Sequence, residues 1–316
     1  MNRRRFIKIL AASATGLSLN KIASATTALK PVRWQGYTLG AEGSFTLYTE
    51  KPRAAQAVLQ RCFAEIQRLE GMFSLYDHKS EISLLNRTGY LKNPSADWLR
   101  MIEAVDHAYT LTDGLFDPTV QPLWKVYDAH FKAHPDSTAL PGTELGRAKQ
   151  QIGWAEVEYD AQAIRFPRPE MQLTLNGIAQ GYITDRVSEI LKEAGYANVL
   201  VELGETRAIG PHPEQRPWNI GIKDADQPTR IQEIAELDNQ ALATSGSYGS
   251  SFSKDGKIHH LIHPKTGHPT TRWKSLSVIA PTGTEADALS TGLSFADAQV
   301  IGQLQEQRSD LKFLLQ

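Results

Sequence analysis

The chain of 316 residues is 41% hydrophobic and 22% charged, a composition typical of a globular protein that is long enough for one large core or two small ones. Its formal net charge is −1 at pH 7. Removing residues 1–25 would take away five basic side chains and no acidic one, so the charge would fall to about −6, which argues against a nucleic-acid partner. The single cysteine, Cys62, excludes a disulfide framework and a cysteine-rich metal site.

The first 25 residues have the organisation of an export signal. Arg3-Arg4-Arg5 precede a mildly apolar run, and Ala23-Ser24-Ala25 has the small-x-small form of a signal-peptidase site. The run is too short for a membrane span, which needs about 20 apolar residues. A basic N-terminal helix is the alternative. We expect residues 1–25 to be a twin-arginine signal and residues 26–316 to be a periplasmic domain, soluble after cleavage.

Apolar periodicity predicts strands and helices without a regular βαβ alternation. We therefore expect a single α+β domain with largely antiparallel sheets packed by helices, not a Rossmann fold. The expected strands and hairpins lie within 32–49, 157–159, 163–166, 198–203, 275–281 and 311–315. The expected helices cover 53–70, a segment from the Ser95 cap to the Gly114 stop, 144–151, 176–194, 285–295 and a last segment from a Ser294 cap to about 306.

Asp287 and Thr291 stand four residues apart near the start of a predicted helix, so they share one of its faces. Oxygen ligands of this kind suit Mg²⁺, which commonly binds together with substrate phosphates. An acidic residue near the positive end of a helix dipole is the simpler alternative, and it requires no metal.

A run of hydroxyl side chains and glycines follows from Ala243 to Phe252. Its backbone amides are suited to holding phosphate oxygens. By composition alone, a solvent-exposed loop rich in turn formers is the better interpretation.

Four histidines, His259, His260, His263 and His268, lie within ten positions. Imidazole suits zinc or copper, but adjacent residues of an extended chain point opposite ways, and no cysteine completes a familiar zinc pattern. One histidine acting as a base, with the others hydrogen-bonded for structural reasons, is the simpler hypothesis.

Two further patterns combine glycines with turn-forming residues. Gly114 to Val120 is explained by a helix stop and a proline turn, and Asn176 to Asp185 by an N-capped helix. Gly177 and Gly181 nevertheless weaken a helix by roughly 1 kcal/mol each, which favours a close approach of ligand or backbone at these positions.

Taken in order, these segments resemble the FAD:protein FMN transferase family, also called ApbE. The resemblance covers roughly residues 36–300. It rests on Phe73-Ser74-Leu75-Tyr76 with Ser80-Glu81 and Leu85-Asn86, Gly114 to Val120 with Pro122-Leu123-Trp124, Gly177 to Asp185, Ala243 to Gly246 with Tyr248, His260 to Pro269, and Ala286 to Thr291.

The resemblance implies an enzyme that uses Mg²⁺ to transfer FMN from its substrate FAD to a Ser or Thr hydroxyl of an exported or membrane-bound redox protein, with release of AMP. It implies His260 as the base that takes the acceptor proton. The implied metal ligands are Asp287, Thr291, the carbonyl of Gly177 and, more weakly, Ser290. The implied flavin-contact positions are Leu39, Tyr76, Leu115, Phe116, Asp117, Thr174, Gln180 and Ile262.

The chain departs from the commonest family pattern at four places. Gln180 stands where Lys is frequent, Thr174 where Asp is frequent, and His263 where Asp or Asn precedes the proline. Gly204-Glu205-Thr206 replaces Gly-Gly-Asp. The segment from Asn176 to Tyr182, together with the twin-arginine signal, is similar to the subgroup that serves nitrous oxide respiration (NosX).

Two other functions remain open from the sequence. With water as the nucleophile, the same site would be an FAD pyrophosphatase that yields FMN and AMP. A periplasmic flavin carrier without turnover is the other alternative. The presence of both Asp287 and Thr291 argues against a carrier with degenerate metal ligands. The acceptor, the oligomeric state and the metal used in the cell are not determined by the sequence.

Overall fold

The structure, a computed structural model, describes residues 9–10, 29–38 and 41–316. Leu39 and most of the expected export signal lie outside these ranges, so the predictions made for them stay predictions. No helix in the described ranges combines the length and apolar character that a membrane span requires.

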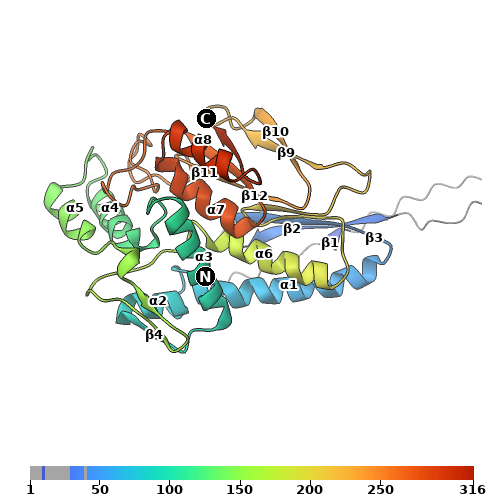
Figure 1. Ribbon diagram of the computed structural model, residues 1–316, viewed down its shortest axis with the longest axis horizontal. Coiled ribbons are helices and arrows are strands. Elements are labelled where there is room, and N and C mark those ends of the chain that lie inside the picture. The colour runs from blue at the N-terminus through green and yellow to red at the C-terminus, as the bar shows by residue number, and fades with distance from the viewer. Residues whose placement is uncertain (1–8, 11–28, 39–40) are drawn as a thin grey trace, which may run out of the picture.

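A long sheet with antiparallel pairings forms the framework of the molecule (Figure 1). Its order is β1-β2-β3-β7-β8-β11-β12-β13, and helices pack against it. The expected α+β architecture is therefore confirmed. The strands are β1 (Ile9–Leu10), β2 (Lys30–Thr38), β3 (Ala41–Thr49), β7 (Val199–Glu202), β8 (Thr206–Ile209), β11 (Ala241–Gly246), β12 (Ser275–Ala280) and β13 (Lys312–Leu315).

Helices α1 (Pro52–Phe73) and α6 (Ala179–Glu193) run along one face of this sheet (Figure 1). Alternate residues of β3 and β7, such as Phe45 and Val201, meet the apolar stripes of both helices in the largest core cluster. Cys62 is fully buried in this cluster, as expected, and burial raises the pKa of its thiol to about 12.

The opposite face of the sheet is covered by the antiparallel strands β9 (Trp218–Lys223) and β10 (Ile231–Leu237). Trp218 and Leu237 of this ribbon pack against Leu242 and Ile279 of the main sheet. The residues of the sheet are thus buried on both sides at its centre, which explains why every residue of β12 is buried.

The C-terminal helices α7 (Gly283–Gly292) and α8 (Ala298–Gln307) cover β11 and β12 through a second core cluster. Helix α7 also packs against α6, where the backbones of Gly181 and Gly283 come so close that a Cβ on Gly181 would lie 2.1 Å from the Gly283 carbonyl oxygen. The two helices that carry the Gly181–Asp185 and Asp287–Thr291 segments are therefore held in direct contact.

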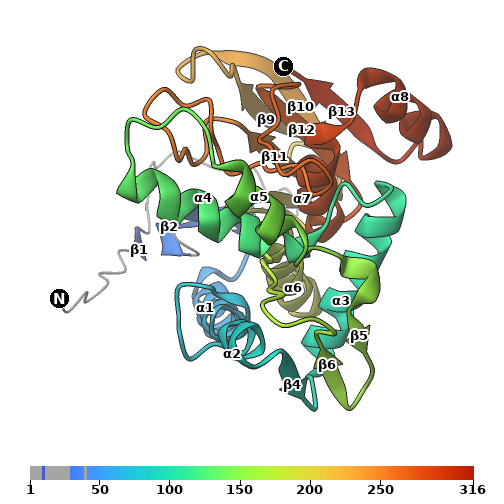
Figure 2. The same ribbon diagram turned by 90° about the vertical axis from the view of Figure 1, so that its left-hand side faces the viewer.

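A peripheral layer of helices and a small sheet extends beside the main sheet (Figure 2). Ser95 accepts a hydrogen bond from the Trp98 amide at the start of α3, and the hairpin expected near 157–166 is present, so both predictions are confirmed. The elements are α2 (Glu81–Thr88), β4 (Tyr90–Lys92), α3 (Ala96–Leu111), α4 (Gln121–Ala133), α5 (Gly142–Lys149), β5 (Glu158–Tyr159) and β6 (Ala163–Arg165), with 3₁₀ turns at Pro118–Val120, Trp154–Glu156 and Leu293–Phe295.

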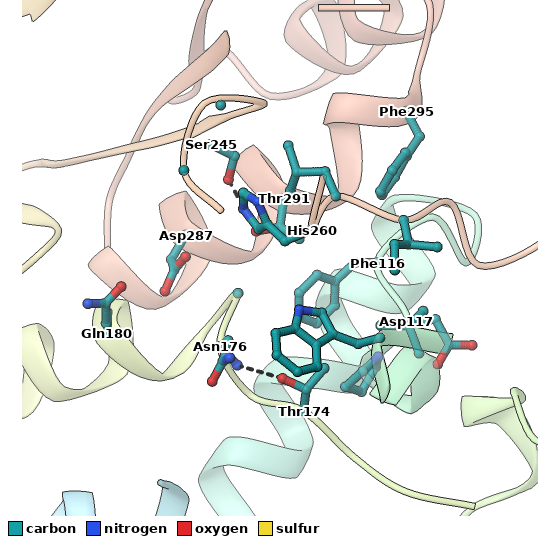
Figure 3. Close-up of a pocket in the computed structure, with 18 of the residues that line it drawn as sticks. Phe116, Asp117, Thr174, Asn176, Gln180, Ser245, His260, Asp287, Thr291 and Phe295 are labelled. Carbon is teal, nitrogen blue, oxygen red and sulfur yellow. Dashed lines mark hydrogen bonds between the residues drawn. The ribbon is translucent and has the colours of Figure 1, made fainter. Parts of the chain in front are cut away.

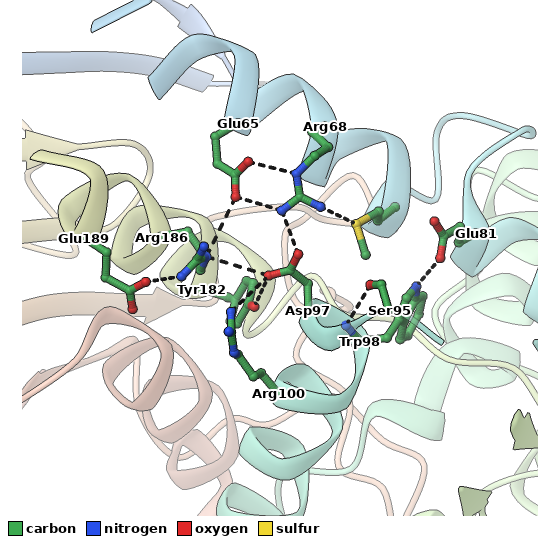
Figure 4. A network of polar contacts seen from close by, with 11 residues as sticks. Glu65, Arg68, Glu81, Ser95, Asp97, Trp98, Arg100, Tyr182, Arg186 and Glu189 are labelled. Atoms are coloured by element: carbon green, nitrogen blue, oxygen red, sulfur yellow. Dashed lines mark hydrogen bonds and ion pairs between the residues drawn. The ribbon is translucent and has the colours of Figure 1, made fainter. Parts of the chain in front are cut away.

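A network of charged side chains joins α1, α3 and α6 (Figure 4). Asp97 accepts hydrogen bonds from Arg68 (2.6 Å) and from the hydroxyl of Tyr182 (2.7 Å), and Arg186 lies 3.7 Å from the same carboxylate. Arg68 is also paired with Glu65 at 2.7 Å. We call these five residues the Asp97 cluster; it ties α6 to the two neighbouring helices.

Several expected element boundaries are wrong. The predicted cap Ser294 lies in a 3₁₀ turn, where its hydroxyl donates to the Thr291 carbonyl, and Asp297 caps α8 instead because the chain extends again at Ala296. The predicted helix 176–194 begins only at Ala179. The segment expected as a loop from Ala243 begins inside the buried strand β11, and helix α2 and the β9–β10 ribbon were not expected.

Candidate functional site

One cavity of about 250 Å³ collects most of the residues singled out from the sequence. It opens between α7, the segment before α6, the segment after α3 and the loop that follows β11 (Figure 3). The predicted site residues that line it are Leu115, Phe116, Asp117, Thr174, Gly177, Gln180, His260, Ile262, Asp287 and Thr291. Segments that are almost two hundred residues apart in the chain thus line one cavity.

Helix α7 presents Asp287 and Thr291 to the cavity one turn apart, as their spacing predicts (Figure 3). Gly177 lies directly against Thr291, because a Cβ on Gly177 would be 2.7 Å from the threonine hydroxyl oxygen. Only glycine allows the backbone at position 177 to approach Thr291 so closely. The three groups implied as cation ligands are therefore adjacent in space.

The carboxylate of Asp287 is held by the start of α6. The backbone amide of Gly181 donates a 3.0 Å hydrogen bond to Asp287 Oδ2, and Asp287 Cβ lies in the space that a side chain at Gly181 would fill. In turn, Asp185 of α6 accepts hydrogen bonds from the Gly283 and Thr284 amides, both 2.8 Å, at the start of α7. These reciprocal bonds fix the two helices and hence the position of Asp287.

Ser290 does not line the cavity. Its hydroxyl donates to the carbonyl of Asp287 (3.0 Å) and lies 2.8 Å from the hydroxyl of Ser245, which is itself 3.2 Å from that of Thr291. The hydroxyl of Ser290 thus bonds within α7 and to β11 instead of pointing into the cavity. Of the two hydroxyl candidates for a cation, the structure brings only Thr291 to the cavity.

A second carboxylate, Glu205, also lines the cavity. Desolvation raises the pKa of Asp287 to about 7, and the neighbouring Asp185 adds to this increase. Desolvation raises the pKa of Glu205 well above its usual value, and the negative charge of Asp287 raises it further. Two neighbouring buried carboxyl groups of this kind would be stabilised in their ionised form by a cationic ligand.

The donor set fits a hard divalent cation. Carboxylate, hydroxyl and carbonyl oxygens are the ligands that Mg²⁺ prefers, and Gly177 leaves space for its carbonyl to take part. In the ranges that the structure describes, no three His, Cys, Asp or Glu residues form a group that could hold a metal ion by themselves. A cation here would depend on mixed oxygen donors and on oxygens of a bound phosphate ligand.

His260 lines the same cavity as Ser245, Asp287 and Thr291 (Figure 3). Gly249 makes room for it, since a Cβ there would be 2.8 Å from the ring. His260 Nδ1 lies 3.1 Å from the Ser250 carbonyl oxygen and 3.2 Å from the Ser250 amide nitrogen; in the tautomer in which Nδ1 donates to the carbonyl, Nε2 keeps a free lone pair. Burial lowers the pKa of His260, so the ring is neutral at pH 7 and able to accept a proton.

The other three histidines have different surroundings. His259 is buried, with Nε2 2.8 Å from the Thr270 carbonyl oxygen and Nδ1 accepting from the Leu261 amide. His263 accepts from the Lys265 amide and packs against Phe295, and the side chain of His268 is exposed. Only His260 of the four lines the cavity.

The segment after α3 forms the apolar wall of the cavity. Phe116 packs against α7 at Gly292, where a Cβ would be 2.8 Å from the phenylalanine Cβ. The carboxylate of Asp117 is buried and accepts from the amides of Thr119 (2.8 Å) and Trp154 (3.2 Å), so it holds the loop in place. Thr174 is joined to this loop by its amide, which donates to the Pro118 carbonyl (2.8 Å).

Tyr76 lies outside the cavity lining, in the turn between α1 and α2, and is 85% exposed. The structure therefore does not bring it together with the other predicted flavin contacts. Leu39 falls outside the described residues.

Sequence reasoning missed several residues that line the site. Phe295 was not considered as a site residue, and Asn176, Glu205, Ser245, Trp124 and Tyr248 were quoted only as parts of motifs. For Glu205, the available signal was an acidic residue directly after a glycine at the end of a buried strand, Val199–Glu202.

Comparisons with known proteins agree with this geometry. The chain is 29% identical over 313 residues to the FAD:protein FMN transferase of Haemophilus influenzae, covering 92% of this chain and 87% of the relative. It is 31% identical over 287 residues to that of Vibrio cholerae serotype O1, covering 87% and 84%.

Solved structures agree at the level of the fold. The flavin transferase ApbE from Vibrio cholerae superposes with a TM-score of 0.77 at 26% identity, covering 91% of this chain and 93% of that one. The apo flavinyl transferase ApbE from Pseudomonas stutzeri gives 0.78 at 25% identity, covering 92% of each. The model of the ApbE family matches residues 39–315. The chain belongs to the ApbE family.

Proposed function

We propose that this protein transfers FMN from FAD to a Ser or Thr hydroxyl of an acceptor protein and releases AMP, with Mg²⁺ as the cofactor. The observation that carries the proposal is the single cavity in which Asp287, Thr291 and Gly177 face a neutral His260. The names of the relatives, FAD:protein FMN transferase, support the same reaction.

The cavity residues have two roles in binding FAD. Asp287, Thr291 and the Gly177 carbonyl would hold Mg²⁺, which neutralises the charge of the diphosphate during transfer. Leu115 and Phe116 provide apolar surface for the flavin nucleotide.

The base step is proton removal from the acceptor hydroxyl by His260 Nε2. The hydroxyl oxygen forms a bond to the phosphorus of the FMN half, while the bond from that phosphorus to the bridging oxygen breaks and AMP leaves with the electron pair. The Ser250 carbonyl, 3.1 Å from His260 Nδ1, orients the ring and stabilises it once it is protonated.

Water in place of the acceptor hydroxyl would make the protein an FAD pyrophosphatase. The same cavity supports both outcomes, because the base and the cation ligands are common to them. A carrier without turnover would not require a neutral base opposite the cation ligands.

A single experiment separates these functions. The protein without residues 1–25 is incubated with FAD, Mg²⁺ and a candidate acceptor domain, and the acceptor mass is measured. An added FMN mass, lost when the acceptor Ser or Thr is replaced by Ala, supports the proposal. Free FMN and AMP without labelling would indicate hydrolysis, and intact FAD would indicate a carrier.

We further propose that the protein is exported by the twin-arginine route and acts on an exported or membrane-bound redox protein. The support is the order of basic, apolar and small residues over residues 1–25. In a bacterial host, the full chain should be found in the periplasmic fraction, and replacement of Arg3, Arg4 and Arg5 by Lys should retain it in the cytoplasm. Export of the Lys variant at the wild-type level would contradict the twin-arginine route.

A further inference from the structure

Glu205 is placed in the cavity by the tight turn between β7 and β8. Gly204 takes the left-handed conformation (φ +97°), and the Leu203 amide donates to the Glu205 carbonyl (2.9 Å) to close the turn. Strand β8 pairs with β11 at Ala241 and Leu242, so the turn ends beside Thr244, whose amide donates to the Glu205 carboxylate. The side chain is therefore directed at the cavity by the end of the main sheet.

The position of Glu205 is also fixed from the side of α6. A Cβ on Gly204 would lie 2.6 Å from the amide nitrogen of the Gln180 side chain, so glycine at 204 lets the turn approach α6. Gln180 lines the same cavity. The turn is thus packed between β11 and α6, and this packing restricts the position of Glu205.

Neither Glu205 nor Asp287 has a basic partner. Within the described part of the chain, no Lys, Arg or His nitrogen forms an ion pair with either carboxylate, although both residues are less than 9% exposed. The nearby Asp185 differs, because Arg207 Nε lies 3.8 Å from it and two amides donate to it. The charge that the cavity pair carries when it is ionised is therefore not paired with a basic side chain of the described residues.

We infer that Glu205 is a further residue of the cation site and binds the divalent cation together with Asp287. Two uncompensated buried carboxylates are costly, and a divalent cation between them removes both the repulsion and the desolvation cost. The hydroxyl of Thr291 and the carbonyl of Gly177 are additional oxygen donors in the same cavity. This inference rests on the cation that is part of the proposed function.

The alternative is a proton shared by the two carboxylates in place of a cation. In that case Glu205 serves only as the acceptor for the Thr244 amide, and cation affinity does not depend on it. The two possibilities predict opposite results for a variant that keeps the shape of the side chain and removes its charge.

The test is calorimetric titration of Mg²⁺, at fixed pH and without FAD, into the protein lacking residues 1–25. We expect Glu205→Gln to weaken Mg²⁺ binding by about 10–100-fold. The matched control is Glu202→Gln, which changes the net charge equally, three positions earlier. Glu202 accepts a hydrogen bond from Ser44 (2.5 Å) and does not line the cavity, so its variant should keep the wild-type affinity within about twofold.

Thermal unfolding provides a second readout that does not depend on catalysis. Without Mg²⁺, Glu205→Gln should be at least as stable as the wild type, because the amide avoids the cost of an ionised carboxylate buried next to Asp287. Added Mg²⁺ should raise the unfolding temperature of the wild type and of Glu202→Gln, but raise that of Glu205→Gln much less.

The outcomes separate this inference from the proposed function. Wild-type Mg²⁺ affinity in Glu205→Gln, with FMN transfer still dependent on Mg²⁺, overturns the inference and leaves the proposed function standing. FMN transfer by wild-type protein after complete removal of divalent cations overturns both. A weakened affinity confined to Glu205→Gln, with a normal control, supports the inference even where an acceptor has not been identified.

Discussion

The Asp97 cluster and the Asp287–Glu205 pair are both groups of buried carboxylates next to helix α6, yet their charges are arranged in opposite ways (Figure 4). Asp97 faces Arg68, Arg186 and the Tyr182 hydroxyl. Although desolvation opposes it, this set of partners lowers the pKa of Asp97, whereas desolvation raises that of Asp287 to about 7.

The difference indicates which cluster serves the fold and which serves a ligand. A carboxylate with its own arginines is satisfied within the protein and has no remaining charge to offer. Asp287 and Glu205 line a cavity that a ligand can enter. They have no basic partner among the described residues, and they share the cavity with a neutral histidine. Perturbed carboxylates of this second kind are typical of functional sites.

Removal of the Asp287 charge should have the largest effect on function. We expect Asp287→Asn to reduce Mg²⁺-dependent FMN transfer by on the order of 10³-fold, because the charge that holds the cation is lost. The same variant should be at least as stable as the wild type without Mg²⁺, since a buried repulsive charge is removed. Acceptor labelling followed by mass spectrometry and thermal unfolding measure the two effects. Full activity would rule out Asp287 as a ligand.

Replacement of His260 tests whether this neutral side chain supplies the base. We expect His260→Ala to slow transfer by about 10²-fold while FAD binding is retained. Burial lowers the pKa of His260 from its ordinary value of 6.5, so at saturating Mg²⁺, which keeps Asp287 ionised, the wild-type rate should be constant near pH 7 and fall in acid as the ring becomes protonated. The variant should lack this acidic decrease. Unchanged labelling rates in His260→Ala would exclude the base role.

Local signals predicted the start of α3 and the face of α7 correctly. Ser95 caps α3, and Asp287 and Thr291 line the cavity together, because capping and the helical repeat depend on residues only a few positions apart. These features are determined by short-range geometry, so they can be predicted without knowledge of the fold.

Features that depend on distant contacts were missed. Strand β11 begins within a run of small and hydroxyl residues that resembles a loop, and it becomes a strand because β8 and β12 pair with it. Strand β10 exposes most of its side chains and has no clear alternation. Glu205 becomes a cavity residue only through the neighbouring ends of β11 and α6.

The glycine contact between α6 and α7 links the two regions of the comparison, because the Gly181 amide donates to Asp287 and the hydroxyl of the next residue, Tyr182, donates to Asp97. A Cβ at Gly181 would lie 2.1 Å from a backbone oxygen, so Gly181→Ala should cost about 2–3 kcal/mol of stability and weaken Mg²⁺ binding. Chemical denaturation and calorimetry measure these effects.

A matched control lies in α1, where nothing is within 4 Å of a Cβ added at Gly71. Gly71→Ala should stabilise the protein by up to about 1 kcal/mol, because alanine favours the helix. Equal effects of the two variants on Mg²⁺ affinity would show that the α6–α7 contact does not position Asp287.

Removal of a charge from the Asp97 cluster should destabilise the protein, unlike removal of the Asp287 charge. Asp97→Asn should destabilise the protein by about 2 kcal/mol, because Arg68 and Arg186 lose their partner; the value is moderate since the Arg68 side chain is 44% exposed. Arg100→Ala, at the exposed rim, should cost less than about 0.5 kcal/mol. Urea unfolding measures both, and transfer by the folded variants should stay near the wild-type rate.

The pH dependence of stability separates the two kinds of carboxylate further. The pKa values of Asp97 and Glu65 are lowered in the folded protein from ordinary values of 3.8 and 4.5. Their contribution is therefore present above about pH 5 and is lost as the pH falls below 4 through the folded values. Asp97→Asn should accordingly lose less stability than the wild type between pH 5 and pH 3. Parallel curves for the two proteins would mean that Asp97 is not a compensated charge, and the contrast with Asp287 would fail.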